Sequence, residues 1–184
     1  MLHVSRWMSW QDGVHLSAVT SADLITPNLV IHLGRMVNTP IGNAPAGIIL
    51  WQPNPPIMPA VMGFVCSDKN VGRYFGPHIF ADTPFEHAPV LNASISVLID
   101  SHKAISTCVV GGYHFEVEMS EFSVPYLINR QPDKMPPYWQ QGVEISCSKT
   151  ILRINGETIN IIVPPVGVKG GPGSTVCPVG IFSR

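Results

Sequence analysis

The stretch VLNASISVLIDSHKAISTC (residues 90–108) decides the predicted fold. It is rich in β-branched and apolar residues, turns at Asp100-Ser101, and resumes with Ala104-Ile105. A second stretch, ISCSKTILRINGETINII (residues 145–162), has the same plan and turns at Asn155-Gly156. Asn-Gly is the strongest short hairpin signal, because both central residues of a type I′ turn need positive φ. A strand pair cannot bury its apolar face alone, so two similar units predict hairpins that stack.

The composition is that of an apolar, weakly charged chain. Of 184 residues, 12% are charged and 45% are hydrophobic, and the net charge is −1. The sequence shows no basic face, so we do not expect nucleic-acid binding. So little charge, together with 18 prolines and 16 glycines, predicts a surface partly covered by partners or by packed loops.

Neither a signal peptide nor a membrane helix is predicted. The first ten residues, MLHVSRWMSW, contain no continuous apolar core, and no apolar run reaches the length of a membrane span. Assembly in the cytoplasm is therefore expected. In that compartment the four cysteines would be thiols or metal ligands rather than disulfides.

Short strand-like segments separated by turn-rich loops predict an all-β fold. Residues 28–37 and 113–119 alternate as strands do, whereas the four prolines of residues 52–59 exclude a central strand. No segment has a clear helical period. Residues 1–26 are predicted to form a short helix or an irregular arm, and residues 164–184 a Gly/Pro-rich tail whose last apolar residues can pack.

We expect one compact unit with two parts. Residues 1–72 would supply an N-terminal extension and base strands, and residues 73–184 the repeat-containing β domain. The predicted architecture is a tapering, β-helix-like or stacked-hairpin structure with long loops. A β-sandwich or jelly roll is the alternative.

The repeat resembles that of PAAR-repeat proteins, the small pointed caps of contractile injection machines. The first copy leads from His87 through Val97-Leu98-Ile99 to Asp100-Ser101. The second copy leads from Ile145 through Ile151-Leu152-Arg153 to Ile154-Asn155-Gly156, and the resemblance covers about residues 77–180. It implies a tapering β-structure whose broad base sits on a trimeric spike.

The resemblance also implies a metal near the apex, held by His and Cys. The positions that match the family's ligands are His87, Cys108, His114 and Cys177, and His78 could replace His87. Two His and two Cys suit a closed tetrahedral site for structural zinc. A narrow tip cannot contain a hydrophobic core, so a metal would supply the missing stability. The alternative is a set of packed thiols and ordinary surface histidines.

A second cluster lies in the aromatic-rich loop of residues 73–89: His78, Asp82, Glu86 and His87. Carboxylate and imidazole groups together could bind a catalytic metal or perform acid–base work. A solvated loop with aromatic anchors is the favoured interpretation. Nucleophile-elbow, phosphate-loop, dinucleotide-binding and His-Glu-x-x-His patterns are absent from the sequence, so no catalytic residue is predicted and the chain is not expected to be an enzyme.

These observations predict a structural spike-tip or cap protein of a phage-tail-like contractile injection apparatus or secretion system. It would dock on a trimeric spike and sharpen it for membrane puncture, with effector cargo and the target membrane as further contacts. Two alternatives remain: an all-β enzyme or carbohydrate-binding module that uses residues 73–89, and a self-assembling shell or coat protein.

Overall fold

The computed structural model describes residues 6–133 and 137–184 and confirms the all-β class. Twelve strands and one short helix follow in the order β1 Trp7–Ala18, β2 Leu29–Thr39, β3 Gly42–Trp51, β4 Val61–Cys66, α1 Lys69–His78, β5 Val90–Asn92, β6 Ser94–Ile99, β7 Lys103–Val110, β8 Tyr113–Phe122, β9 Tyr126–Arg130, β10 Trp139–Ile154, β11 Glu157–Ile159 and β12 Ser174–Ser183.

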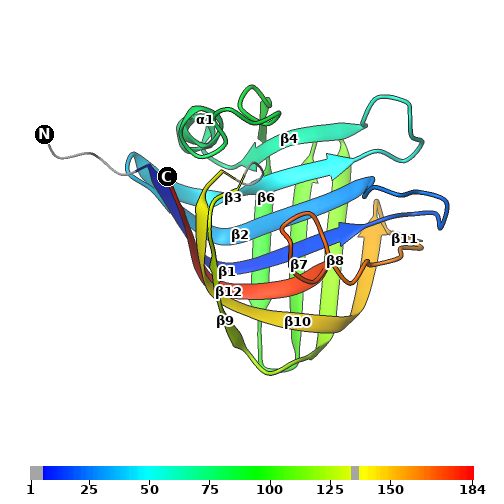
Figure 1. The fold of residues 1–184 in the computed structure, drawn as a ribbon. Helices are drawn as coiled ribbons and strands as arrows, with labels where there is room; N and C mark the ends of the chain where they lie inside the picture. The colour runs from blue at the N-terminus through cyan, green and yellow to red at the C-terminus, as the bar shows by residue number, and fades with distance from the viewer. Residues whose placement is uncertain (1–5, 134–136) are drawn as a thin grey trace, which may run out of the picture.

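All strands belong to one sheet, which curves into a nearly closed, barrel-like shape (Figure 1). The strand order is β5-β4-β3-β2-β1-β12-β10-β8-β7-β6, and β9 and β11 both pair with β10. Every neighbouring pair is antiparallel except β4 with β5. Strands from residues 1–72 and from residues 73–184 are therefore hydrogen-bonded neighbours.

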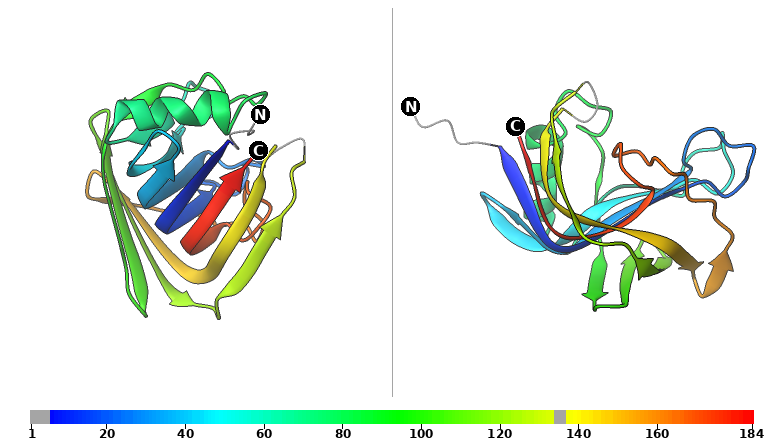
Figure 2. Two further views of the ribbon diagram at one scale, coloured as in Figure 1. Left: turned by 90° about the vertical axis from the view of Figure 1, so that its left-hand side faces the viewer. Right: turned by 60° about the horizontal axis from the view of Figure 1, so that its bottom comes forward.

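The bend of β10 curls the sheet. Its first half pairs with β12 and β9, and its second half pairs with β8 and β11. A register shift between Val143 and Ile145 marks a bulge in the first half, a feature that bends a strand. In Figure 1, β6, β7 and β8 lie behind β1–β4 and β12, and the left view of Figure 2 shows the resulting cradle from the side, with these green strands at its left edge.

The predicted hairpins form as expected locally. Asn155 and Gly156 have φ of 53° and 83°, and they connect β10 to β11. Between β6 and β7, the Asp100 carboxylate accepts hydrogen bonds from the backbone N–H groups of His102 and Lys103, which closes that turn.

The hairpins do not stack as rungs of a tapering ladder, so this part of the predicted architecture is wrong. β7 and β8 separate β6 from β10 within a single sheet. Leu98 on β6 is 67% exposed, whereas Leu152 on β10 is fully buried. The sequence pattern specified each turn, but the neighbours of each strand depend on burial across the whole sheet.

Three segments differ from their predicted structures. Residues 7–18 are a central strand rather than a helix or an arm, and residues 174–183 are the central strand beside it. Helix α1 extends into residues 73–89, which were predicted to form a loop. The Asp68 side chain begins this helix by accepting hydrogen bonds from the N–H groups of Asn70 and Val71.

The sheet has a core on each face. On one face, β1–β4 pack against β6–β8 through fully buried residues such as Leu16, Ile31 and Phe115. On the other face, α1 and the segment after it cover part of the sheet through Phe64, Phe75 and Ile79. Within the described residues, no helix has both the length and the apolar character needed to cross a bilayer.

Candidate functional site

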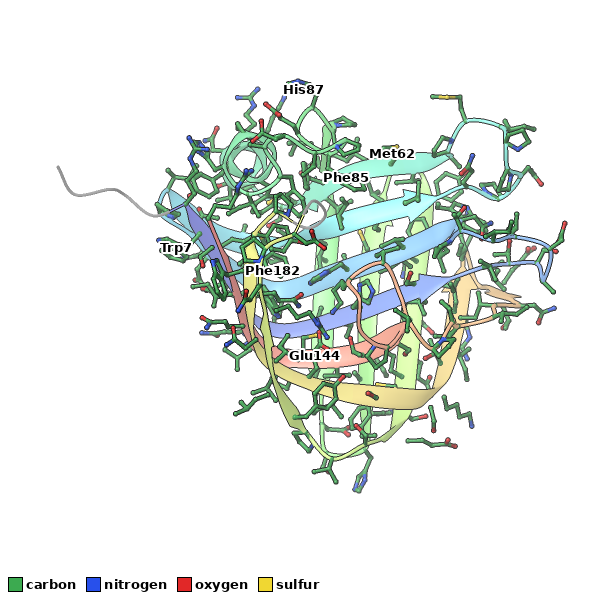
Figure 3. All side chains as sticks on the ribbon, in the orientation of Figure 1. Trp7, Met62, Phe85, His87, Glu144 and Phe182 are labelled. Atoms are coloured by element: carbon green, nitrogen blue, oxygen red, sulfur yellow. The ribbon has the colours of Figure 1, made fainter. Side chains whose placement is uncertain are left out.

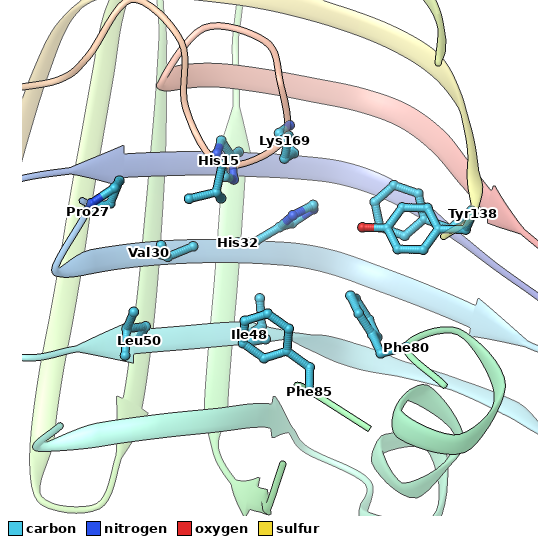
Figure 4. Close-up of a pocket in the computed structure, with 12 residues that line it drawn as sticks. His15, Pro27, Val30, His32, Ile48, Leu50, Phe80, Phe85, Tyr138 and Lys169 are labelled. Carbon is cyan, nitrogen blue, oxygen red and sulfur yellow. The ribbon is translucent and has the colours of Figure 1, made fainter. Parts of the chain in front are cut away.

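A cavity of about 320 Å³ lies on the second face of the sheet (Figure 4). Strands β1, β2, β3 and β12 form its floor, and the segment after α1, Tyr138 and the loop of residues 163–173 form its walls. Its lining residues are His15, Pro27, Val30, His32, Ile48, Leu50, Phe80, Phe85, Tyr138, Val168, Lys169 and Phe182. The volume falls in the range of small-molecule sites.

The two-residue repeat of the strands places these side chains in the cavity. On β2, Ile31 and Leu33 are buried in the apolar core, whereas the alternate residues Val30 and His32 line the cavity. Antiparallel pairing then sets His32 directly opposite His15 of β1. The same row continues to Thr175 on β12 and to Ile48 on β3, so polar and apolar groups lie side by side on the cavity floor.

A buried ion cluster lies next to this row. The Glu144 side chain is fully buried at the bulge of β10. Arg130 Nη2 lies 2.8 Å from its Oε2, and Lys169 Nζ lies 3.0 Å from its Oε1. Burial alone would raise the pKa of Glu144, but the hydrogen bonds and charges of Arg130 and Lys169 lower this pKa to about 2. Two cations therefore share one carboxylate, and one positive charge remains beside the cavity.

Lys169 connects the cluster to the cavity. It comes from the loop before β12, which crosses the face of the sheet, and its side chain is 8% exposed. Its ammonium also lies 3.5 Å from Thr175 Oγ1 and 3.6 Å from Cys177 Sγ. Gly170, with φ of +77°, lets the chain turn directly after the lysine. The loop thus delivers a cation to an otherwise apolar wall.

The two histidines of the cavity floor are uncharged at neutral pH. Their rings meet edge to face with centroids 5.6 Å apart. Burial, and next the positive charge of Lys169, lower the pKa of His32 to about 3, although Glu144 acts in the opposite direction. Burial is also the main reason that the pKa of His15 lies well below its usual value, followed by the charge of Lys169.

Aromatic rings form the opposite wall. Tyr138 and Phe182 pack with centroids 4.2 Å apart, and Phe80 meets Phe85 edge to face at 6.2 Å. Burial raises the pKa of the Tyr138 hydroxyl, so this wall carries no charge. Figure 3 shows Phe85, Phe182 and Glu144 on the same side of the sheet. The site therefore combines a large apolar wall with one localised cation.

The structure does not bring the predicted zinc ligands together. His87 is exposed in the segment after α1, far from Glu144 in Figure 3, and His114 is exposed on β8. Cys108 is buried in the core between the sheet faces, whereas Cys177 lies against Lys169. Across residues 6–133 and 137–184, no three His, Cys, Asp or Glu side chains gather as a metal site requires. Zinc therefore stays a prediction without an assembled site.

The alternative ligand His78 and the second predicted cluster also lie outside the cavity. His78 ends helix α1 and stacks on Tyr74 with centroids 4.4 Å apart. Asp82 pairs with Arg184 at 3.2 Å, and Glu86 accepts a hydrogen bond from the Asp82 backbone N–H at 2.8 Å. These carboxylates thus stabilise the segment after α1, which contributes only Phe80 and Phe85 to the cavity.

Sequence reasoning missed the polar residues of the site. His32 and Glu144 each stand inside a strand-forming apolar run, LVIHLG and GVEIS, and a polar residue in such a run was an available signal. His15 carried less signal, because residues 7–18 were not predicted as a strand. Lys169 carried none, since its burial depends on the path of a Gly/Pro-rich loop.

Comparison with known proteins finds two solved structures. No family model and no curated protein matches the chain. One match is an acetoacetate decarboxylase with 8% sequence identity and a TM-score of 0.44, covering 96% of this chain and 86% of that one. Another is the acetoacetate decarboxylase from Legionella pneumophila subsp. pneumophila str. Philadelphia 1, with 10% identity and a TM-score of 0.40, covering 99% and 87%. At these TM-scores neither match carries an argument about activity.

The prediction of a spike-tip cap is wrong. The cap requires the two hairpins to be successive rungs of a tapering ladder, but β7 and β8 separate β6 from β10 within one curved sheet. The expectation that the chain is not an enzyme stays a prediction.

Proposed function

We propose that this chain binds a small, largely apolar organic acid in the cavity, with the acid group directed to Lys169. The observation that carries the proposal is Lys169, which lines a largely apolar cavity and whose ammonium shares the carboxylate of Glu144 with Arg130. A cation that is only partly neutralised and removed from water favours an anionic ligand group.

The walls support an apolar body for this ligand. Val30, Leu50, Phe85 and Phe182 present apolar surface to the cavity. Each Å² of such surface removed from water contributes roughly 25 cal/mol, so a chain or ring that fills the cavity gains affinity without further polar contacts. The anionic group then fixes the orientation of the ligand.

Binding of octanoate, followed by isothermal titration calorimetry, tests this proposal. Lys169→Met keeps the length of the side chain and removes its charge, and we expect it to weaken octanoate binding at least tenfold, or by about 1.4 kcal/mol. Lys149→Met is the matched control, because Lys149 is exposed on β10. Equal affinity in Lys169→Met and the wild type would contradict the proposal.

A second candidate is chemistry on a carbonyl compound at the same lysine. The observation that favours it is the position of Lys169, whose buried primary amine lies in the wall of a largely apolar cavity, because such an amine can form a covalent C=N bond with a carbonyl ligand. The amine nitrogen would attack the carbonyl carbon, the carbonyl oxygen would leave as water, and a C=N bond would join Lys169 to the ligand.

Borohydride trapping distinguishes this second candidate from simple binding. Borohydride delivers hydride to the C=N carbon and leaves a stable secondary amine, which peptide mass spectrometry would locate on Lys169. The test uses 2-octanone and 3-oxooctanoate as probes. An adduct on the wild type and none on Lys169→Met is the expected result; absence of any adduct on Lys169 would remove the carbonyl candidate and leave acid binding in place.

A further inference from the structure

The cavity floor contains a buried imidazole without a partner. His15 is 1% exposed, and neither of its ring nitrogens has a hydrogen-bond partner among the residues that the structure describes. Buried polar groups in proteins are nearly always paired, and each one left unpaired costs roughly 1–3 kcal/mol. The side chain of His32, directly opposite on β2, also makes no hydrogen bond with any described residue.

Among the described residues, the neighbouring polar groups form hydrogen bonds with one another and not with either imidazole. The Thr175 hydroxyl, opposite His15 on β12, lies within hydrogen-bond distance of Lys169 Nζ and Cys177 Sγ. The Lys169 ammonium is directed to Glu144 at 3.0 Å. His15 and His32 both line the cavity, so a group bound there is the remaining candidate partner for their nitrogens (Figure 4).

The chemistry of the imidazoles indicates the kind of partner. A neutral imidazole offers one N–H donor and one acceptor nitrogen. A hydroxyl group has the same two capacities and carries no charge, so it pairs with either nitrogen. A carboxylate only accepts, and the adjacent cation of Lys169 is the better place for it.

We propose that His15 and His32 select a ligand that carries a hydroxyl group in addition to the acid group that meets Lys169. The ligand class is thus a hydroxylated, otherwise apolar carboxylic acid. This inference rests on the proposed function, because it assigns the second polar contact of the same site. His15 and His32 are specificity-determining residues here, and no chemical step is assigned to them.

Matched acids that differ only in one hydroxyl test the inference. Octanoate is compared by calorimetry with hydroxyoctanoates that carry the hydroxyl at successive carbons. We expect one position to bind the wild type about tenfold more tightly than octanoate, the value of one additional hydrogen bond in a desolvated site. A single favoured position is expected because the two histidines and Lys169 are fixed relative to one another by the sheet and its ion cluster.

Variants of the two histidines test whether these residues cause the tighter binding of the hydroxy acid. His32→Phe and His15→Phe keep a ring and remove both nitrogens, so each should reduce the ratio of hydroxy-acid affinity to octanoate affinity several-fold. His32→Gln keeps a donor and an acceptor and should retain part of the preference. His102→Phe, in the exposed turn between β6 and β7, is the control and should change neither affinity.

The outcomes separate the two proposals. If octanoate fails to bind the wild type, the proposed function falls and the selection by histidine falls with it. If octanoate binds but no hydroxy acid binds more tightly, water fills the role of the partner and only the histidine proposal is overturned. It is also overturned if His32→Phe and His15→Phe fold, as judged by near-ultraviolet circular dichroism, and keep the full preference.

Discussion

The two faces of the curved sheet differ in what they bury. The face that packs against β6–β8 buries apolar side chains such as Leu16, Ile31 and Phe115. The opposite face holds Glu144, Lys169 and the two adjacent histidines beside a cavity. The comparison shows that the two faces of one sheet can have different roles. The face filled with apolar residues stabilises the fold. The face with the cavity keeps buried polar groups, which stability alone does not favour.

Phenylalanine truncation should reveal the largest difference between the faces. Phe115→Ala removes a fully buried ring from the filled face and should lower the free energy of unfolding by about 3–5 kcal/mol. Phe85→Ala removes a partly buried ring from the cavity wall and should cost less than roughly half of that, because solvent already reaches the site. Urea unfolding of both variants measures the difference, and equal losses would contradict it.

Loss of the shared carboxylate should be nearly as costly. Glu144→Gln leaves the buried Lys169 and the partly buried Arg130 without their anion, so we expect a loss of about 3 kcal/mol in unfolding free energy. Glu116→Gln is the matched control, because its ion pair with Arg153 is about one-third exposed on both sides. That control should cost less than about 1 kcal/mol. Similar losses in the two variants would mean that the buried cluster contributes no more than a surface pair.

Acid should destabilise the cavity face before the apolar face. The folded-state pKa values of His15 and His32 lie below 6.5, so the unfolded chain binds more protons and stability is lost as the pH falls below that value. Between about pH 7 and pH 5, we expect a loss of roughly 1–2 kcal/mol per histidine. Urea unfolding across this range measures it, and the double variant His15→Phe/His32→Phe should lose distinctly less. Equal pH dependence of the two proteins would contradict the prediction.

The smallest change in unfolding free energy is expected for an exposed residue outside the apolar core and the cavity. Leu98 is 67% exposed on β6, although it stands in the same apolar run as buried Val97. Leu98→Ala should change the unfolding free energy by less than about 0.5 kcal/mol. A loss above about 2 kcal/mol in urea unfolding would show that this leucine is covered in solution.

Local turn chemistry made part of the fold predictable. Asn155-Gly156 and Asp100-Ser101 marked two hairpins that the structure contains. The first turn requires two residues with positive φ, and in the second the Asp100 side chain accepts a backbone hydrogen bond, so both signals lie within four residues. Helix α1 could have been found from Asp68, whose side chain caps its first turn, and from Val71, Tyr74 and Phe75, which are buried at helical spacing, although the helix also contains Gly72, Gly76 and Pro77.

The site was not predictable in the same way. The zinc set relied on matching His87, Cys108, His114 and Cys177 to a stacked repeat, and the structure distributes these residues over separate parts of the fold. The polar groups of the cavity come from β1, β2, β10 and the loop before β12. No short sequence spacing connects these segments, because their proximity depends on which distant strands pair.

By itself, the sequence determined the all-β class and the positions of the hairpin turns, since these depend on side-chain alternation and on backbone preferences within a few residues. Only the tertiary structure decided that residues 7–18 and 174–183 are central partners, and that Lys169 pairs with Glu144 and lines the same cavity as His15. The physical reason is that a strand chooses distant neighbours by burying both faces of the sheet together, a requirement that no local stretch contains.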